Sequence, residues 1–329
     1  MAFTNEVAYS DSRAKRLEEC PRAYWYGVYR MWNGWYSRSQ PPKDKKAEEA
    51  YTAKFASNGP MWAGSVVHQI AERFLKDAKS RHGFLDAVGG REALRTLMRD
   101  AASMEVSKGL EQAKNQRIGN PKHRLQLVEC NFGYPLDDDW IKRRVLGRID
   151  ALTQETWESG PNLFMRAVSA PEGIVSIEDL KEVKLFGVKC FIKLDLLARS
   201  KQNPDKDCVI VDWKTGAKTE NDHGRLQIAT YAVWARKAGW RNARTFLAYL
   251  GDGLGESVEA DIGIDEADRL VSTRIVSFVE SLKTRLVGGD LSRNEPIESA
   301  FESTKDPSVC KSCPFQGVCE RDGTKPAEI

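Results

Sequence analysis

The sequence has no long hydrophobic run, because no apolar stretch approaches the roughly 20 residues that a helix needs to cross a bilayer. Its first residues, Met1 to Glu6, do not have the pattern of a secretion signal. Internal repeats and low-complexity tracts are also missing. We therefore expect a cytoplasmic protein with no membrane-embedded part.

A strong charge imbalance is missing as well. The 329 residues include 50 lysines and arginines against 47 aspartates and glutamates, so the formal net charge is +3. Such a chain is not a polycation, and any surface that binds nucleic acid would have to be a local groove. Hydrophobic residues make up 41% of the chain. This composition is ordinary for a soluble globular protein, and the length suits one large domain or two ordinary ones.

Cysteines are few, and their number is odd. The chain has seven, which argues against a disulfide framework in a reducing compartment. Three lie close together as Cys310-x2-Cys313-x5-Cys319, a spacing typical of metal ligands that leaves a tetrahedral site one thiolate short. Cys20 precedes a proline, as Cys313 does. The remaining cysteines are expected in the core or in strands; they are Cys130, Cys190 and Cys208.

What the sequence does contain is a short β-branched run that ends in an acid and a lysine. Residues 209–216 read Val-Ile-Val-Asp-Trp-Lys-Thr-Gly, which predicts a buried strand that ends at the Thr-Gly step. Side chains alternate along a strand, so Asp212 and Lys214 share one face and Trp213 points to the other. The carboxylate can hold a divalent cation while the ammonium positions or deprotonates a water. Taken alone, such a pair is more often a surface salt bridge.

More strands surround this one. They are expected at 174–180, 188–197, 243–250 and 256–262. A turn at Leu185-Phe186-Gly187 makes the first two antiparallel, and Asp195 lies on the second. Two carboxylates on neighbouring strands, Asp195 and Asp212, suit one or two Mg²⁺ or Mn²⁺ ions, with the carbonyl of Trp213 as a further oxygen ligand.

Helical patterns occupy most of the remaining chain. We expect helices within 8–36, 61–75, 77–127, 138–157, 224–235 and 264–287, and a loop at 37–58. On the second of these helices, Gly64, His68 and Glu72 are four residues apart and share a face, as Gln227 and Tyr231 do on a later helix. A small residue, an imidazole and a carboxylate in this arrangement let a metal approach closely, although a structural hydrogen bond is the simpler explanation of the His–Glu pair.

Taken in order, these motifs resemble those of RecB-type nucleases in the PD-(D/E)XK superfamily. The motifs are Gly64-x3-His68-x3-Glu72, Asp195, Asp212-Trp213-Lys214 and Gln227-x3-Tyr231. Cys20 together with the C-terminal cluster is similar to the split four-cysteine set of an iron–sulfur branch, which includes CRISPR-adaptation exonucleases, AddB-type helicase-nucleases and single-strand exonuclease relatives. The similarity spans residues 20–319, and the order of the motifs carries it.

The resemblance implies a restriction-endonuclease-like α/β (α+β) fold, with a mixed central sheet flanked by helices, a helical insertion and an iron–sulfur staple that joins the N- and C-terminal segments. Residues 1–329 would form a single nuclease domain. Its parts would be an N-terminal segment with the first cluster cysteine (1–60), a helical part with the histidine motif (61–160), a catalytic sheet core (174–262) and a C-terminal helix with the cysteine cluster (263–329).

The implied activity is that of a Mg²⁺- or Mn²⁺-dependent deoxyribonuclease, an exonuclease that acts on single strands or ends. The implied metal ligands are His68, Asp195, Asp212 and the carbonyl of Trp213. Lys214 would orient the attacking water, Gln227 and Tyr231 would support the site or contact DNA, and Glu72 would help with a second metal. Asp150 is a rival for the second acid, but we prefer Asp195 because Asp150 falls in a helical pattern.

The cysteines and the partners complete these expectations. Cys20, Cys310, Cys313 and Cys319 would bind a [4Fe–4S] cluster, with Zn²⁺ as the alternative, since four thiolates suit either. The expected partners are DNA and a helicase or other DNA-processing proteins; the chain has no P-loop, so a motor would be a separate chain. An alternative function is a catalytically silent, cluster-bearing DNA-binding or scaffold subunit, and another is a zinc-bound regulatory module.

Overall fold

A computed structural model of the chain describes residues 6–35, 44–115, 124–157, 160–216, 222–251, 253–260 and 262–319. These residues form two compact units. Unit 1 comprises Met1–Gly59, Gly109–Leu136 and Ile275–Ile329, and unit 2 comprises Pro60–Lys108 and Asp137–Arg274. Within the described residues, no helix is both long and apolar enough to cross a membrane. The single nuclease domain stays a prediction, and each unit is described by itself.

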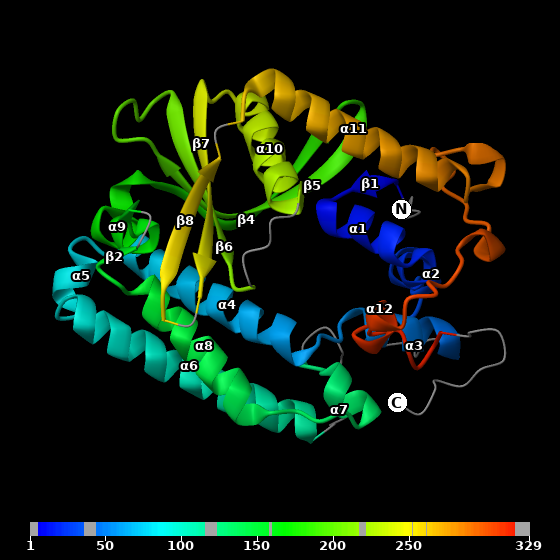
Figure 1. The fold of residues 1–329 in the computed structure, drawn as a ribbon, viewed down its shortest axis with the longest axis horizontal. Helices are drawn as coiled ribbons and strands as arrows, with labels where there is room; N and C mark the ends of the chain where they lie inside the picture. The colour runs from blue at the N-terminus through cyan, green and yellow to red at the C-terminus, as the bar shows by residue number, and fades with distance from the viewer. Residues whose placement is uncertain are drawn as a thin grey trace. The chain divides into compact units, whose positions relative to one another are not determined.

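Unit 2 contains the sheet (Figure 1). Its elements are α4 (Gly59–Ser80), α5 (Phe84–Ala87), most of α6 (Arg91–Lys114), α8 (Asp138–Leu152), β2 (Thr156–Trp157), β3 (Gly160–Pro161), α9 (Leu163–Ser169), η3 (Pro171–Gly173), β4 (Ile174–Leu185), β5 (Val188–Arg199), β6 (Asp207–Lys214), α10 (Asp222–Lys237), β7 (Asn242–Leu250), β8 (Gly255–Ala260) and the first half of α11 (Ile264–Lys283).

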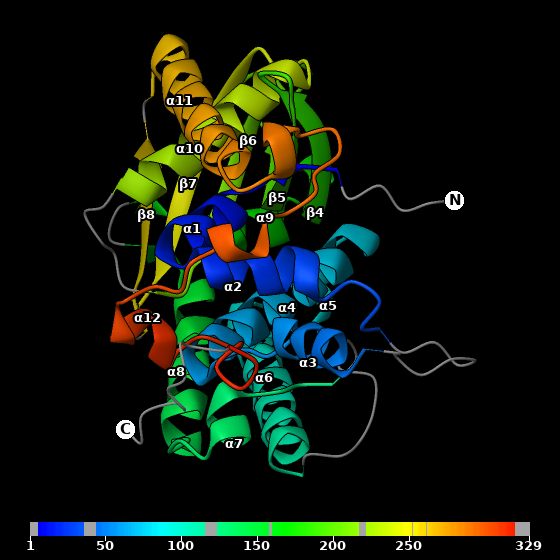
Figure 2. The same cartoon turned by 90° about the vertical axis from the view of Figure 1, so that its right-hand side faces the viewer.

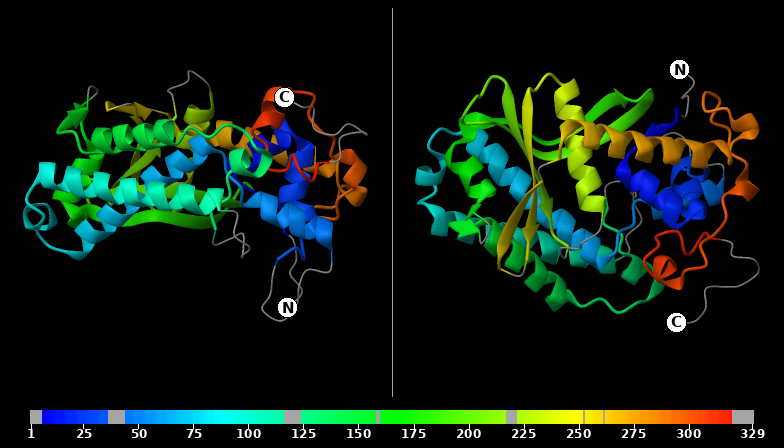
Figure 3. Two further views of the ribbon diagram at one scale, coloured as in Figure 1. Left: turned by 90° about the horizontal axis from the view of Figure 1, so that it is seen from below. Right: turned by 45° about the horizontal axis from the view of Figure 1, so that its top comes forward.

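The strands of unit 2 pair in the order β4-β5-β6-β7-β8. All neighbours are antiparallel except β6 and β7, which are parallel and are joined by α10, because a parallel pair needs a crossover connection. Figures 1 and 3 show the strands of this sheet and α10 lying against it. The mixed central sheet flanked by helices is therefore confirmed, and so are the antiparallel strands around Asp195 and the strand that ends at Lys214.

The two faces of β6 pack against different helices. The ring of Trp213 lies 6.1 Å from that of Phe164 on α9 and 6.4 Å from that of Trp157, both nearly perpendicular to it. The neighbouring Asp212 instead accepts a hydrogen bond from Tyr231 on α10. Since successive side chains point to opposite faces, α9 and α10 cover opposite faces of β6, and the acid lies on the α10 face.

Unit 1 is mainly helical. Its elements are β1 (Ala8–Tyr9), α1 (Asp11–Glu19), α2 (Pro21–Trp25), the π-helix η1 (Tyr26–Arg30), α3 (Lys45–Lys54), α7 (Val128–Phe132), the end of α11, η4 (Val287–Gly289), η5 (Glu298–Ala300) and α12 (Pro307–Lys311). In Figure 2, α12 lies close to α1 and α2. This unit therefore brings together elements from the beginning and the end of the described chain.

An aromatic core holds the N- and C-terminal parts of unit 1 together. The ring of Tyr24 is parallel to that of Phe301 at 6.3 Å and edge-on to that of Phe278 at 6.1 Å. All three rings are buried, and burying each contributes roughly 1.5–3 kcal/mol. The hydroxyl of Tyr29 donates to Asn294 at 2.6 Å. Side-chain packing alone thus joins the two ends, before any metal is considered.

Three element predictions were wrong. The expected loop at 37–58 contains α3, which begins where the Asp44 carboxylate accepts hydrogen bonds from the backbone of Lys46 and Ala47. The helix expected over 138–157 ends at Leu152, and α11 ends at Lys283 rather than near residue 287. Two parts of the expected elements lie outside the described residues. They are residues 37–43 of the expected loop at 37–58 and residues 116–123 of the expected helix at 77–127.

Candidate functional site

The register of the β4–β5 hairpin places Glu178 opposite Asp195. The strands are joined by the two-residue turn Phe186-Gly187, whose φ angles of 47° and 82° are both positive, as in the type I′ turn that suits tight hairpins. Ile177 pairs with Leu196, and the same register holds on the far side of Glu178. Glu178 itself has a φ of 48°, a strained value for a residue with a β-carbon.

Asp195 in turn lies next to Asp212 on the other side. Leu196 of β5 pairs with Val211 of β6, and the next residues along that register are Asp195 and Asp212. The backbone N–H of Trp213 donates to Asp195 Oδ2 at 2.8 Å. Burial raises the pKa of Asp195, and the neighbouring charge of Asp212 raises it further. Glu178, Asp195 and Asp212 thus form a row of carboxylates across β4, β5 and β6.

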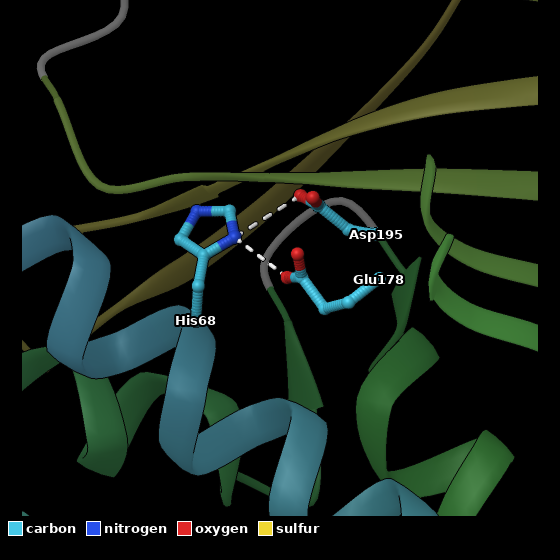
Figure 4. Close-up of side chains that lie close together, drawn as sticks. All are labelled: His68, Glu178 and Asp195. Carbon is cyan, nitrogen blue, oxygen red and sulfur yellow. Dashed lines mark hydrogen bonds and ion pairs between the residues drawn. The ribbon is translucent and has the colours of Figure 1, made fainter. Parts of the chain in front are cut away.

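A histidine on α4 points at this row (Figure 4). His68 Nδ1 lies 3.1 Å from Glu178 Oε1 and 3.4 Å from Asp195 Oδ2. Burial lowers the pKa of His68, but hydrogen bonds and attraction to Asp195 and Glu178 outweigh it and raise the pKa to about 10. Without a metal, the imidazolium therefore bridges the two carboxylates.

The carboxylate of Glu178 is almost fully enclosed, with 5% of its side chain exposed. Its second oxygen forms an ion pair with Lys193, and burial alone would raise its pKa. The hydrogen bonds from His68 and Lys193 hold the pKa of Glu178 below its ordinary value. Glu178 is therefore an ionised, buried acid, which is the state a metal ligand needs.

A second network fixes Asp212 and Lys214. Oδ1 of Asp212 accepts hydrogen bonds from Gln227 Nε2 at 2.8 Å and from the hydroxyl of Tyr231 at 2.6 Å. Lys214 Nζ lies 2.6 Å from Asp212 Oδ2 and donates to Gln227 Oε1 at 2.5 Å. The geometry at Asp212 Oδ2 is not that of a hydrogen bond, so this buried oxygen accepts none within the described structure. This oxygen of Asp212 therefore faces the ammonium of Lys214.

Close packing between α4 and the end of β6 brings His68 near this network. A β-carbon on Gly64 would lie 2.6 Å from the Thr215 hydroxyl, closer than non-bonded atoms approach. The Thr215 carbonyl accepts hydrogen bonds from Arg148 at 2.8 Å and Arg144 at 3.1 Å. Glycine at position 64 thus permits the approach of the helix, and two arginines of α8 hold the turn that follows Lys214.

The residues present fit a divalent cation. One ligand atom each from His68, Glu178 and Asp195 lie within 4.8 Å of one another. Two carboxylates and an imidazole form a donor set that Mn²⁺ and Mg²⁺ can use. The oxygen of Asp212 that accepts no hydrogen bond lies on the neighbouring strand. A cation would also relieve the repulsion that raises the pKa of Asp195.

Most residues that the sequence nominated lie in or beside this site. The structure brings together His68, Asp195, Asp212, Lys214, Gln227 and Tyr231. The side chain of Trp213 points to the other face, although its backbone contacts Asp195. Glu72 pairs with Lys76 of its own helix at 2.5 Å. Asp150, the rival acid, lies on α8 and pairs with Arg95 and Arg99.

Glu178 was missed by the sequence reasoning. A signal for it existed, because a two-residue turn at Phe186-Gly187 fixes which residues of the two strands face each other. Counting back from Leu185 and forward from Val188, which pair at the turn, leads to Glu178 opposite Asp195.

The four nominated cysteines all lie in unit 1. Burial raises the pKa of Cys313 to about 11, and the nearby thiols of Cys20, Cys319 and Cys310 raise it as well. The three other thiols are therefore close enough to Cys313 to affect its pKa. Among the described residues, no three of these sulfur atoms lie within 4.8 Å of one another.

Aromatic packing holds the cysteine loop in place. Phe315 is 1% exposed and stacks on Tyr26 with 5.7 Å between ring centroids. The hydroxyl of Tyr26 donates to the carbonyl of Val318 at 2.6 Å. A β-carbon on Gly27 would lie 3.2 Å from Arg16 Nη1 and 3.3 Å from Phe315. The loop that carries Cys313 and Cys319 is thus seated on η1, directly after the helix that Cys20 begins.

Comparisons with known proteins agree with this arrangement. A family model described as the PD-(D/E)XK nuclease superfamily matches residues 8–320. No curated protein matches the chain. Among solved structures, 13 chains match. One is the crystal structure of SSO0001, with 18% identity over 49% of this chain and 68% of that one, and a TM-score of 0.26. At that score the structural likeness carries no argument.

Proposed function

Because this chain belongs to the PD-(D/E)XK nuclease superfamily, we propose that it is a Mg²⁺- or Mn²⁺-dependent DNA nuclease that acts on single strands or ends. The superfamily supports the metal-dependent nuclease activity. The observation that carries the proposal is the row of Glu178, Asp195 and Asp212 across three strands, with His68 and Lys214 beside it. End-directed exonuclease action is the more specific part of the proposal.

Each group of the site has a role in hydrolysis. His68, Glu178, Asp195 and Asp212 would hold the divalent cation, with the carbonyl of Trp213 as a further ligand. When bound, such an ion lowers the pKa of a water molecule and neutralises charge on the phosphate.

The remaining groups orient these ligands and the water. Lys214, beside Asp212 and Gln227, would orient the attacking water and stabilise the negative charge that develops on the phosphate. Gln227 and Tyr231 donate hydrogen bonds to one oxygen of Asp212, which would leave its other oxygen for the cation. These supports keep the carboxylate in one orientation before the substrate arrives.

The thiols of Cys20, Cys310, Cys313 and Cys319 would hold a [4Fe–4S] cluster with a structural role. Around one zinc ion, four sulfur atoms at about 2.3 Å from the metal lie close to one another. In a four-iron cluster each thiolate binds a different iron atom, so the sulfurs are farther apart. The pattern of one remote cysteine and three local ones supports the iron–sulfur alternative, since zinc sites usually combine short-range pairs of ligands.

The test is cleavage of end-labelled DNA. Purified protein is incubated with single-stranded and duplex DNA, labelled at the 5′ or the 3′ end, and with Mg²⁺, Mn²⁺ or a chelator. We expect metal-dependent products that shorten stepwise from an end, and resistance of circular single strands. Lys214→Ala should abolish cleavage without preventing folding. The control Lys237→Ala, at an exposed position on α10, should leave cleavage unchanged.

Two results would contradict the proposal. Intact DNA with both metals would exclude nuclease activity and, if the DNA is bound, would favour the silent scaffold. Cleavage of circular single strands would retain the nuclease but reject the end-directed action.

A further inference from the structure

A cavity of about 560 Å³ lies on the face of the sheet that is turned away from the carboxylate row. Its lining includes Leu196 of β5 and Val211 of β6. Leu196 directly follows Asp195, and Val211 directly precedes Asp212. Their side chains therefore point to the face opposite the two carboxylates. The residues of α9 and of η3 close the other side of the cavity. The site described above therefore does not account for this cavity.

The floor and the rim of the cavity differ in chemistry. The floor includes the buried side chains of Ile174, Leu196 and Val211. The charged side chains around it are exposed; they are the cations Arg166, Arg199, Lys201 and Arg244 and the single carboxylate Glu172. A net positive rim around an apolar floor favours a ligand that has both an anionic group and an apolar body.

Neighbouring groups orient some of the cations on the rim. Arg199 Nη1 donates to the carbonyl of Pro204 at 2.8 Å and lies 3.8 Å from the carboxylate of Asp205. The guanidinium of Arg244 lies 5.1 Å from the ring centroid of Phe246. Among the described residues of unit 2, no ion pair to an acid is found for Arg166 or Lys201. The rim therefore offers positive charge from two separate elements, α9 and the loop after β5.

We propose that this cavity binds a nucleoside monophosphate, with its phosphate at the cationic rim and its base and sugar over the apolar floor. The volume lies in the range of small-molecule sites, roughly 300–1,000 Å³, and far exceeds the volume of a phosphate ion. Guanidinium groups bind phosphate through paired, charge-assisted hydrogen bonds. The inference goes beyond the proposed nuclease function, because binding here requires no metal and no cleavage.

The experiment is calorimetric titration in the presence of a chelator. Without a metal, the carboxylates Glu178, Asp195 and Asp212 repel a phosphate, so binding at that site does not interfere. The probes are deoxyadenosine monophosphate, deoxyadenosine and inorganic phosphate. We expect the nucleotide to bind at least tenfold more tightly than either of the others, since only the nucleotide uses both rim and floor. Equal binding of the nucleotide and one of its parts would overturn the proposal, as would no binding at millimolar concentration.

Variants locate the binding. Arg166→Glu combined with Arg244→Glu should weaken nucleotide binding by about tenfold or more, because two charge-assisted contacts become repulsive. Both positions are exposed, so the variant should keep its thermal unfolding temperature. Arg81→Glu, exposed in the same unit but outside the cavity lining, serves as the control. Nucleotide binding that is unchanged in the double variant would reject this cavity as the site, whatever the outcome of the cleavage assay.

Discussion

Glu178 faces Asp195 across the β4–β5 hairpin, and both carboxylates contact the same nitrogen of His68. This relationship places Glu178 in the proposed metal site even though it lies in none of the motifs found in the sequence. Its positive φ of 48° costs energy, on the order of 1–3 kcal/mol. We take the strain as a further indication that this side chain has a functional role.

Glu178→Gln keeps the shape of the side chain but removes its charge. We expect Mn²⁺ affinity, measured by calorimetry, to fall by roughly 10–100-fold or more, since loss even of a supporting group has effects of this size. Glu182→Gln is the matched control, because Glu182 lies on the same strand, has 60% of its side chain exposed and pairs with Lys189. Unchanged affinity in Glu178→Gln would mean that Glu178 only holds His68 and Lys193.

Gly64→Ala should destabilise the protein. Alanine ordinarily stabilises a helix relative to glycine by roughly 0.5–1 kcal/mol, but here the new methyl group would lie 2.6 Å from the Thr215 hydroxyl. We expect a loss of about 1–3 kcal/mol in unfolding free energy, measured with urea, and weaker metal binding because His68 moves with α4. Adding Thr215→Ala to Gly64→Ala should restore much of the stability and of the metal binding. If Gly64→Ala alone stabilises the protein, the close packing of α4 against Thr215 is contradicted.

Sequence reasoning recovered the strands and most of the site because the signals are local. The alternation of Val-Ile-Val-Asp-Trp-Lys set the faces of β6, and the spacing of Gln227 and Tyr231 set the face of α10. The helix α3 was missed because its surface is rich in lysine and glutamate, and its buried face consists only of small residues such as Ala47 and Ala50.

Other features depend on contacts that are distant in sequence. The hydrogen bond from Trp213 to Asp195 and the clash that excludes a side chain at Gly64 exist only once β6 has met its neighbours. The role of Glu178 lies between these cases: the turn at Phe186-Gly187 determines the register, but only a residue count along both strands reveals the pairing.

Tyr231→Phe tests the support of Asp212. The buried hydroxyl donates to Asp212 Oδ1 at 2.6 Å, and its removal should cost about 1–2 kcal/mol of stability. We expect kcat for DNA cleavage to fall by roughly tenfold or more while DNA affinity changes little, because the hydroxyl orients a ligand rather than the substrate. A change confined to KM would instead indicate that Tyr231 contacts DNA.

The raised pKa of His68 predicts how stability depends on pH in the presence of a chelator. The folded-state value of about 10 lies above the ordinary value of 6.5, so protonation favours the folded state. The stabilising contribution is complete below about pH 6.5 and is lost as the pH rises through about 10. The difference in unfolding free energy between wild type and His68→Gln should therefore shrink over this range. If this difference in unfolding free energy grows with pH instead, folding lowers the pKa of His68 rather than raising it.

If the four thiols hold the proposed iron–sulfur cluster, loss of one of them should remove the cluster without unfolding unit 1. Cys313→Ser deletes the thiol on whose pKa the other three act. We expect wild-type protein purified without oxygen to contain iron and sulfide and to be brown, and the variant to lack all three. Unit 1 should retain structure because Tyr24, Phe278 and Phe301 pack its ends together independently. The circular dichroism spectrum of the variant should then differ little from that of the wild type, while its thermal unfolding temperature should be lower. Cys130→Ser, in the same unit, should keep the iron. Stoichiometric zinc in the colourless wild type would replace the iron–sulfur assignment with the zinc alternative.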